Sequence, residues 1–477
     1  MNAELVQDVI CEVRRRMSAT PAAPRQTITR HARGAGDDGR FGLFATVDGA
    51  VSAATEAQKK LERLSLDDRD TLVKLVKKMA KDNARTWGEM EFAETKIGRL
   101  DHKIEKLEIL ELVPGVEFLK SRAQSGGNGL CLEEFAPFGV IGAITPITHS
   151  IPTLTANIIS MLSAGNAIVA NPHPNAMRCA AHAVREYNRA IHSRYGIEHA
   201  VCCITPATLR TAEELFHHRD IPLLVATGGP AVARAALASR KRAIVAGPGN
   251  PPVVVDETAC VDNAAKSIVQ GAAYDNNLLC IGEKQVFAVD AIFDKLIAAM
   301  QRNRAVLLDD RQVESLTKNA FTFDKNNEPH VVKELIGRDA TALALAAGAS
   351  VPPSTQLLFG VTDFNHPFVK EEQMMPFIPF VRCRNVDEAI ARAVESEHGY
   401  RHTALIHSRN IDAITKFARA ARTTIFVVNG PSMAGLGLGG EGYLSYSIAT
   451  PTGEGVTNPL TFTRFRRTTL VGSMRMI

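Results

Sequence analysis

The sequence of 477 residues lacks several features that would each suggest a class of function. Its eight cysteines contain no C-x-x-C pair, which argues against zinc-ribbon and thioredoxin-like sites and indicates a reduced chain with mostly buried thiols. No apolar run reaches the roughly 18 residues of a membrane span, and no signal peptide is recognisable. Lys and Arg (55) are interspersed with Asp and Glu (51), so no nucleic-acid surface is indicated. We therefore expect a cytoplasmic chain that binds neither membrane nor nucleic acid.

Residues 1–17 carry an apolar stripe at helical spacing, with charged residues elsewhere around the helix. Residues 18–40 are rich in Ser, Ala, Pro, Gly and Arg and predict a flexible linker. A helix of this length is marginal alone in water, so its stripe needs a partner. The linker favours a detachable docking helix, and the alternative is a helix folded back on its own domain.

After a helical region up to about Lys120, short apolar runs alternate with helical stretches. The runs are residues 140–145, 167–171, 223–227, 253–256, 286–289 and 424–429. Continuous apolar strands separated by helices predict an α/β protein whose parallel sheets are covered on both faces.

Two glycine motifs and one histidine pair require interpretation. Thr227-Gly228-Gly229 lies between a predicted strand and a predicted helix, where backbone N–H groups can hold a phosphate. The G-x-G-x-x-G match at Gly435–Gly440 has no helix after it and is interpreted as a loop. His398 and His402 lack the H-E-x-x-H arrangement, so no metal site is predicted.

Cys280 follows the polar cluster Asp275-Asn276-Asn277 and precedes an apolar strand. Such a thiol can be partly exposed and ionisable, although composition alone does not distinguish it from a small buried hydrophobe. It becomes a candidate only in combination with other segments of the chain.

Several segments together resemble the aldehyde dehydrogenase superfamily, from Phe41 to the carboxyl terminus. PFGVIGAITPITHSIPTLTANIISMLSAGNAIVANPHP resembles its P-x-G-V … I-x-P-W-N-F-P … A-A-G-N … K-P block, and EEQMMP resembles E-E-x-F-G-P. The resemblance implies that Cys280 is the nucleophile, that Thr227-Gly228-Gly229 meets the cofactor phosphates and that Glu372 holds the nicotinamide ribose. AGPGNPPVVVD, DNNLLCIGEK and GGEGYLSYSIATPTGEG resemble the CoA-acylating branch of ethanolamine and propanediol utilisation.

Departures from the superfamily pattern refine this expectation. Ala246 stands where hydrolytic members have the Glu that activates water, so no general base for hydrolysis is evident. The oxyanion-hole Asn aligns with Thr148, and His149 follows it, which leaves the donor open between these two residues beside the Cys280 N–H. The Lys for the adenine ribose is replaced by Asn171.

The resemblance implies a CoA-acylating aldehyde dehydrogenase that uses NAD and coenzyme A through a cysteine thioester, with propionaldehyde favoured and acetaldehyde the alternative. Some lowering of the Cys280 pKa below about 8.5 is expected. The expected site residues are Cys280, Thr148 and His149 for catalysis, and Thr145, Pro146, Pro172, His173, Thr227, Gly228, Gly229, Gly247 and Glu372 for the cofactor. The competing hypotheses are a hydrolytic aldehyde or semialdehyde dehydrogenase and an inactive cargo or docking protein.

The expected domains are a Rossmann-like cofactor domain (41–120 and 136–246), a catalytic domain (247–448) and oligomerisation extensions (121–135 and 449–477). A homodimer or tetramer is implied by the extensions. The same branch is commonly enclosed in bacterial microcompartments, so residues 1–17 are expected to be an encapsulation peptide that binds shell or core proteins.

Overall fold

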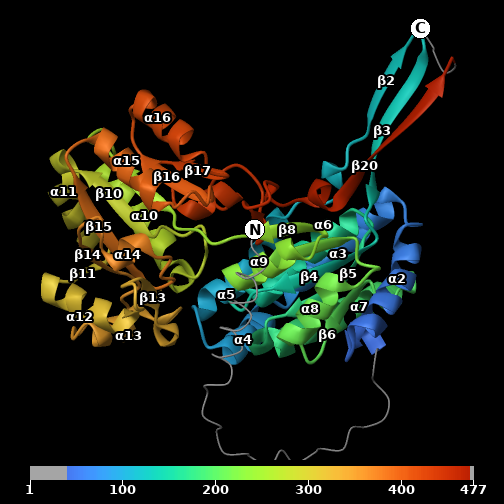
Figure 1. The fold of residues 1–477 in the computed structure, drawn as a ribbon, viewed down its shortest axis with the longest axis horizontal. Helices are drawn as coiled ribbons and strands as arrows, with labels where there is room; N and C mark the ends of the chain where they lie inside the picture. The colour runs from blue at the N-terminus through green and yellow to red at the C-terminus, as the bar shows by residue number, and fades with distance from the viewer. Residues whose placement is uncertain (1–39, 473–477) are drawn as a thin grey trace, which may run out of the picture. The chain divides into compact units, whose positions relative to one another are not determined.

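A six-stranded parallel sheet dominates the first half of the chain in the computed structural model, which describes residues 40–472 (Figure 1). Its order is β1 (Leu43–Phe44), β6 (Val201–Ile204), β5 (Ala167–Pro172), β4 (Val140–Thr145), β7 (Leu223–Thr227) and β8 (Arg242–Ala246). The chain runs outward from β4 through β5 and β6, then returns to place β7 on the other side of β4. This reversal creates the crevice at which α/β sheets bind ligands.

Helices cover both faces of this sheet. They are α2 (Val47–Leu61), α3 (Leu66–Asp82), α4 (Ala84–Thr95), α5 (Leu100–Glu108), α6 (Ser150–Ser163), α7 (Met177–Tyr195), α8 (Leu209–His217) and α9 (Pro230–Ala238). Local sequence defines their starts: the Ser65 side chain accepts from the Asp68 N–H and closes a capping box before α3. The helix α6 is buried at all of its positions, because α3, α4 and α7 also pack against it.

A seven-stranded parallel sheet forms the second half. Its order is β11 (Val306–Leu307), β14 (Leu358–Val361), β15 (Phe377–Cys383), β10 (Gln285–Val289), β9 (Pro252–Val255), β16 (Thr403–His407) and β17 (Ile425–Val428). The helices of this half are α10 (Val261–Ala273), α11 (Asp290–Arg302), α12 (Asp310–Ala320), α13 (Ala340–Ala346), α14 (Pro367–Lys370), α15 (Val386–Ser396) and α16 (Ile411–Ala421).

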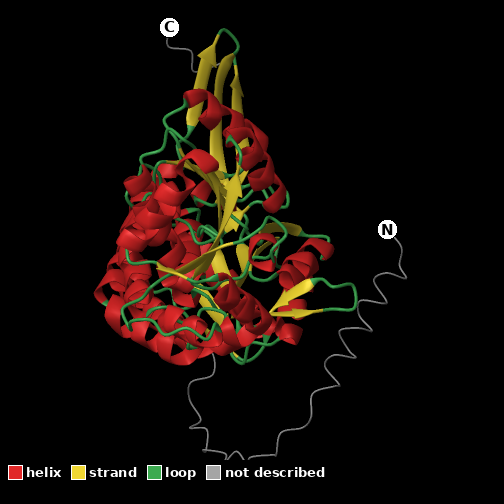
Figure 2. Cartoon of the chain, turned by 90° about the vertical axis from the view of Figure 1, so that its left-hand side faces the viewer, coloured by secondary structure: helices red, strands yellow, loops and turns green. Residues whose placement is uncertain are grey.

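Three smaller sheets are antiparallel. The strands β2 (Arg122–Gly126), β3 (Gly129–Pro137) and β20 (Thr463–Val471) form an arm that extends away from the helices around the first sheet (Figures 1 and 2). Two short pairs are β12 (Phe321–Phe323) with β13 (Pro329–Val331), and β18 (Ile448–Ala449) with β19 (Gly455–Val456). Because β20 pairs with β3, the carboxyl-terminal segment returns to the first half of the chain.

The predicted α/β class with parallel sheets is confirmed. Strand limits differ by a residue or so: β5 continues to Pro172, and β17 is restricted to residues 425–428. The predicted docking helix (1–17) and linker (18–40) lie outside the described residues, apart from Arg40. Across residues 40–472, no helix is long and apolar enough to cross a bilayer, and no group of three or more His, Cys, Asp or Glu side chains could hold a metal ion.

Candidate active site

A cavity of about 360 Å³ lies between the ends of the two large sheets. The first sheet contributes residues at the carboxyl ends of β4, β5, β7 and β8. The second half contributes Gly247 and Pro248 before β9, Cys280 before β10, and Glu372 and Met374 before β15. Carboxyl ends of one parallel sheet therefore oppose the loops at the amino ends of the other.

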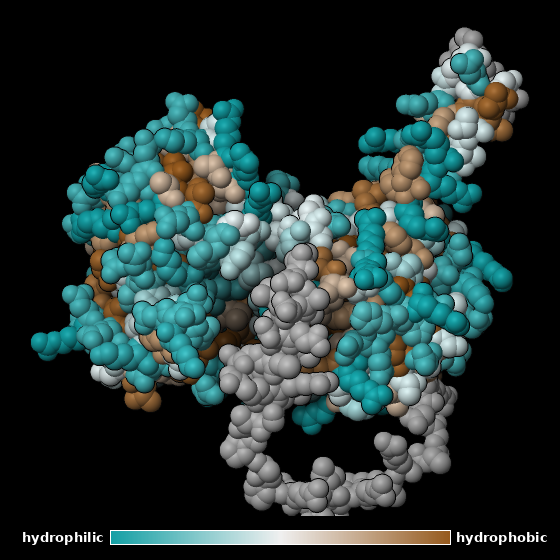
Figure 3. Space-filling model, in the orientation of Figure 1, coloured by the Kyte–Doolittle hydropathy of each residue, from teal (hydrophilic) through white to brown (hydrophobic). Residues whose placement is uncertain are grey.

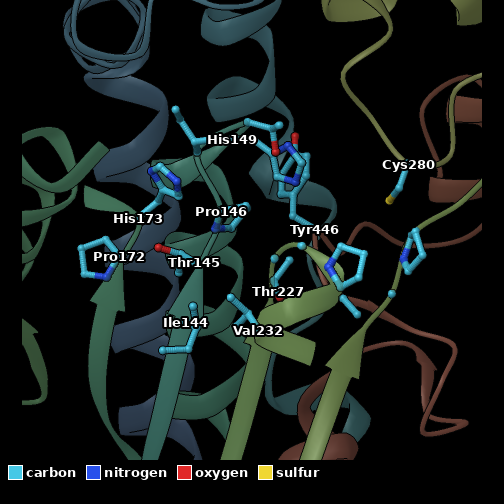
Figure 4. Close-up of a pocket in the computed structure, with 18 of the residues that line it drawn as sticks. Ile144, Thr145, Pro146, His149, Pro172, His173, Thr227, Val232, Cys280 and Tyr446 are labelled. Carbon is cyan, nitrogen blue, oxygen red and sulfur yellow. The ribbon is translucent and has the colours of Figure 1, made fainter. Parts of the chain in front are cut away.

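All twelve residues predicted for catalysis or cofactor binding line this cavity. They are Thr145, Pro146, Thr148, His149, Pro172, His173, Thr227, Gly228, Gly229, Gly247, Cys280 and Glu372. In Figure 4, Cys280 stands on the side opposite Pro172 and His173, with Thr227 and Tyr446 between them. The cavity thus brings a thiol from the second sheet to a crevice made by the first.

The turn after β7 has room for a ligand. Gly229 is the N-cap of α9, and a Cβ built there meets no atom within 4 Å. A Cβ on Gly228 meets only Val232, at 3.8 Å. The start of a helix offers free N–H groups and a positive end to a phosphate, so this open space fits the diphosphate of a dinucleotide.

Two buried polar atoms in the cavity have no hydrogen-bond partner among the described residues, Thr145 Oγ1 and His149 Nδ1. His149 is the N-cap of α6, and its ring lies 5.4 Å from that of Tyr446. Burial, together with the charges of Lys106 and Lys103, holds the pKa of His149 well below its usual range. His149 is therefore a neutral imidazole that retains one N–H donor. Unpartnered buried groups are costly, so both atoms point to a polar ligand.

One end of the cavity is formed by residues after β5 and by the start of α8. Asn171 Oδ1 accepts from the Thr211 hydroxyl at 2.6 Å, so this side chain is already engaged within the protein. His173 accepts from the Asn175 N–H at 3.2 Å and also lines the cavity. Leu209 and Val232 add apolar surface. This end can enclose a planar base between apolar side chains without a lysine.

The loop that presents Cys280 has an unusual backbone. Asp275, Asn276 and Asn277 have φ values of 48°, 55° and 62°, a left-handed run of three residues other than glycine. Such strain persists only where the surroundings over-determine it. Here Asp275 pairs with Lys106, Asn276 donates to Gly98 O, Gly337 O and Asp339 Oδ1, and Asn277 donates to Glu283 O. The segment that leads to Cys280 is therefore held in place by its hydrogen bonds and ion pair.

The Cys280 thiol is half-buried, and burial followed by the charge of Glu372 raises its pKa to about 12. Lys284 and the N–H groups of Cys280 and Ile281 oppose this rise. The expected lowering of the Cys280 pKa is therefore wrong, because desolvation outweighs the favourable effects of Lys284 and the N–H groups.

Among the described residues that line the cavity, Glu372 is the one carboxylic acid. Burial raises its pKa to about 7, while Lys284 and the Gly249 N–H lower it. Gly249 is constrained, since a Cβ there would lie 2.4 Å from Cys280 O. Ala246 is buried in the cavity wall and supplies no base.

Four buried charged side chains connect the two halves of the site. Lys103 donates to Glu91 Oε1 at 3.0 Å and to the Thr148 carbonyl, and Glu91 Oε2 accepts from the Ile151 N–H at 2.8 Å. Lys106 pairs with Asp275, which also lies 3.9 Å from Lys103. The network therefore ties the Thr148 loop after β4 to the Cys280 loop.

Comparisons with known proteins agree with this geometry. The sequence matches the aldehyde dehydrogenase family over residues 43–442. An acetylating acetaldehyde dehydrogenase of Bilophila wadsworthia is 43% identical over 481 residues, 99% of each chain. A CoA-propanoylating propanal dehydrogenase of Citrobacter freundii is 36% identical over 431 residues, 90% of this chain and 92% of that one.

This chain belongs to the aldehyde dehydrogenase family. The crystal structure of Rhodopseudomonas palustris propionaldehyde dehydrogenase with bound propionyl-CoA is similar, with a TM-score of 0.87 and 42% identity over 91% of this chain and 96% of that one. A propionaldehyde dehydrogenase from the Clostridium phytofermentans fucose utilisation bacterial microcompartment has a TM-score of 0.89 and 41% identity over 91% of this chain and all of that one. The predicted resemblance to this family and its CoA-acylating branch is confirmed.

Sequence reasoning missed Gly249, Tyr446 and three of the four charged residues of the network, Glu91, Lys103 and Lys106; Asp275 was noted only as part of the polar cluster before Cys280. Tyr446 lines the cavity and donates from its hydroxyl to Lys106 O at 3.0 Å. It lies within the GGEGYLSYSIATPTGEG segment, which carried the only available signal. Glu91 and Lys103 carry no signal, because charged positions on amphipathic helices usually face solvent.

Proposed function

We propose that this protein is a CoA-acylating aldehyde dehydrogenase, which converts a short-chain aldehyde, NAD and CoA into acyl-CoA and NADH. The observation that carries the proposal is the cavity in which Cys280 faces the crevice of the first sheet and Ala246, which the resemblance aligns with the base of hydrolytic members, lines the wall. A thiol nucleophile, together with the absence of a water-activating carboxylate at position 246, favours transfer of the acyl group to a second thiol.

Cys280 carries the acyl group. Its thiolate adds to the aldehyde carbon, forming a C–S bond and an oxyanion. Collapse of the oxyanion expels the aldehyde hydrogen as hydride and leaves a thioester on Cys280. The CoA thiolate then attacks the thioester carbon, the C–S bond to Cys280 breaks, and acyl-CoA leaves with the enzyme thiolate restored. Exchange between two thioesters is nearly isoenergetic, so the second half is reversible.

The oxyanion is held by the Cys280 N–H and by a donor from the loop after β4. Thr148 and His149 are the two candidates, and both line the cavity. His149 is neutral, with an unpartnered Nδ1, and it can donate without bringing a full charge. Preorganised donors of this kind contribute about 3–4 kcal/mol to acyl-transfer reactions.

NAD, when bound, would supply the acceptor for this hydride. The open turn at Gly228 and Gly229 would hold its diphosphate, and Glu372 would bind the nicotinamide ribose. Leu209 and Val232 would enclose the adenine. Thr227 itself donates to or accepts from Ser447 at 2.7 Å, so it shapes the turn.

A two- or three-carbon aldehyde is the proposed substrate. Curated relatives named for acetaldehyde are 43–44% identical to this chain, and those named for propanal are 36% identical. The solved structures at 41–42% identity are of propionaldehyde dehydrogenases. Ile147, Leu278 and Met374 line the cavity and suit a short alkyl chain.

The proposal is tested by NADH formation from propionaldehyde or acetaldehyde and NAD, with and without CoA, with the product identified by mass spectrometry. We expect turnover only with CoA and an acyl-CoA product. Cys280→Ser should retain NAD binding and lose nearly all turnover, and Cys260→Ser, at an exposed thiol, should behave as the native protein. Equal rates without CoA and release of free acid would instead establish a hydrolytic enzyme. NAD binding without turnover would establish a docking protein.

We further propose that the arm joins copies of this chain into a dimer or tetramer. Phe135, Phe465, Leu470 and Val471 are exposed on it, and β2 is an edge strand of its sheet. An exposed edge and exposed apolar side chains favour pairing with a second chain. Phe465→Asp should lower the mass measured by light scattering, whereas Phe323→Asp, at an exposed residue outside the arm, should leave it unchanged. An unchanged mass in both variants would show that the arm is not the contact between copies of this chain.

Residues 1–17 are proposed to direct the protein into a bacterial microcompartment by binding a shell or core protein. Their sequence carries the apolar stripe, and a similar solved structure comes from a microcompartment. A reporter fused to residues 1–40 should co-localise with a shell. A variant with charged residues in the stripe is the control, and a diffuse signal from the unaltered fusion would contradict the proposal.

A further inference from the structure

The helix α4 presents two carboxylates, Glu91 and Glu94, to the starts of two neighbouring helices. Their side chains are 1% and 8% exposed, and residues three apart lie on the same side of a helix. Glu91 Oε2 accepts from the Ile151 N–H at 2.8 Å, in the first turn of α6. The two oxygens of Glu94 accept from the Arg178 N–H at 2.9 Å and the Cys179 N–H at 2.7 Å, in the first turn of α7.

These two helices have no cap from their own local sequence. His149 precedes α6 and Ala176 precedes α7, and neither N-cap residue accepts a hydrogen bond with its side chain. In contrast, α3 and α8 begin with capping boxes made by local residues. The first turn of a helix has N–H groups without partners in the helix, and a carboxylate accepts from them at the positive end of the helix dipole. The helix α4 therefore supplies the caps that the local sequence lacks.

The segment that leads to α7 lines the active-site cavity with Pro172, His173 and Pro174. Its two prolines have fixed φ angles, which leaves the segment little freedom. The His173 N–H donates to Thr145 O at 3.0 Å, and the Ala176 N–H donates to His173 O at 2.9 Å. A displacement of the start of α7 would therefore displace the side chains that this segment presents to the cavity.

We propose that Glu94 is a positioning residue for the cofactor, because it holds the start of α7 and thereby the segment 172–176 in the shape that binds the nucleotide. This role deepens the proposed function and rests on NAD as its cofactor. Glu91 acts in the same way on the loop after β4, which carries the two candidate oxyanion donors. One turn of α4 therefore sets two parts of the cavity separately, Glu94 for cofactor binding and Glu91 for acyl transfer.

The test compares NADH binding, measured by the fluorescence of the dinucleotide, with CoA-dependent turnover in the full-length protein. Glu94→Gln leaves one of the two N–H groups without an acceptor. The dissociation constant of NADH should rise by roughly fivefold, the factor by which loss of a typical helix cap disfavours a conformation, and the lost turnover should be recovered at high NAD concentration. Glu91→Gln should do the opposite and lower kcat while NADH binding is retained.

Arg178→Gln is the matched control. It keeps the backbone N–H that Glu94 accepts from and changes only a side chain that is 80% exposed, so binding and turnover should equal those of the native protein. Glu94→Asp keeps the charge on a side chain too short to reach both N–H groups. It should also weaken NADH binding, and it provides the measurement if Glu94→Gln does not fold.

A Glu94→Gln variant that loses stability to urea but binds NADH as tightly as the native protein would overturn the positioning role. Equal effects of Glu91→Gln and Glu94→Gln on both NADH binding and kcat would also overturn it, since they would indicate a general loosening of α4. Native turnover with unchanged NADH binding in Glu94→Gln would refute this inference alone. Weaker binding in Glu94→Gln, without any turnover by the native protein, would refute the proposed function alone.

Discussion

Replacement of Lys103 by Met is expected to disturb both stability and catalysis. Lys103 is 1% exposed. Lys103 and Lys106 are the two cations of a buried network in which Glu91 and Asp275 are the two anions. The change leaves Glu91 without its partner at 3.0 Å and the Thr148 carbonyl without its ammonium donor. An uncompensated carboxylate would then remain 1% exposed at the junction of the two halves.

The expected loss of unfolding free energy in Lys103→Met follows from the burial of Glu91. Breaking a buried ion pair by removing one partner costs about 3–5 kcal/mol. An exposed pair is worth less than about 1 kcal/mol, so Lys78→Met is the matched control: Lys78 pairs with Asp82 at 2.6 Å with side chains 72% and 54% exposed. Because Lys103 also holds the Thr148 loop, a shift of its oxyanion donor should lower kcat by roughly 100-fold. NAD binding at the turn after β7 should persist, since no member of the network touches it.

Urea unfolding and steady-state kinetics on both variants provide the measurement. The double variant Glu91→Gln/Lys103→Met should recover part of the lost stability, because it removes the unpaired carboxylate. An unfolding free energy for Lys103→Met within about 1 kcal/mol of the Lys78→Met control would refute the reasoning, since that is the range of an exposed pair. A full loss of stability with unchanged kcat would limit the network to a structural role.

Three further predictions concern neighbouring positions. Ala246→Glu should release free acid in the absence of CoA, measured by product analysis; no acid at all would show that the missing base does not explain the preference for CoA. Gly249→Ala should lower kcat and cost about 1–3 kcal/mol, because its Cβ would lie 2.4 Å from Cys280 O, whereas Gly126→Ala, with no atom within 4 Å, should be neutral in the same unfolding and turnover assays. Burial raises the pKa of Glu283 from 4.5 to about 7, so the native state loses stability relative to the unfolded state as the pH rises through this window. Glu283→Gln should remove a fall of about 3 kcal/mol in the unfolding free energy between pH 4.5 and 7, and an identical pH profile for both proteins would contradict the assignment.

The surface hydropathy in Figure 3 illustrates why some features escape prediction from sequence. Helical segments of both halves present mainly hydrophilic side chains outward, as their amphipathic patterns predict. Glu91 and Lys103 lie on two such helices, α4 and α5, yet they are buried where these helices meet the loops of the site. The periodicity of a helix indicates which of its faces is polar, but it does not indicate whether another segment of the chain covers that face.

The same limit applies to the reactive thiol. The polar cluster before Cys280 correctly drew attention to this loop, but its left-handed backbone depends on partners as distant as Gly98, Lys106 and Gly337. Whether the pKa of Cys280 is raised or lowered depends on how deeply the sulfur is buried and on the charges of Glu372 and Lys284. None of these quantities is a property of the local sequence.

The sequence by itself determined the alternation of buried strands and amphipathic helices, because side-chain periodicity and β-branched runs act over a few residues. Through their place in a recognisable order of motifs, it also predicted Cys280 as the nucleophile, the glycine turn after β7 as a phosphate site and the lack of a hydrolytic base at Ala246. The tertiary structure alone decided that these pieces meet in one cavity and that buried lysines balance its charges. The physical reason is that electrostatic interactions in a desolvated site depend on distance and burial, which are fixed only when the loops at the ends of the two sheets come together.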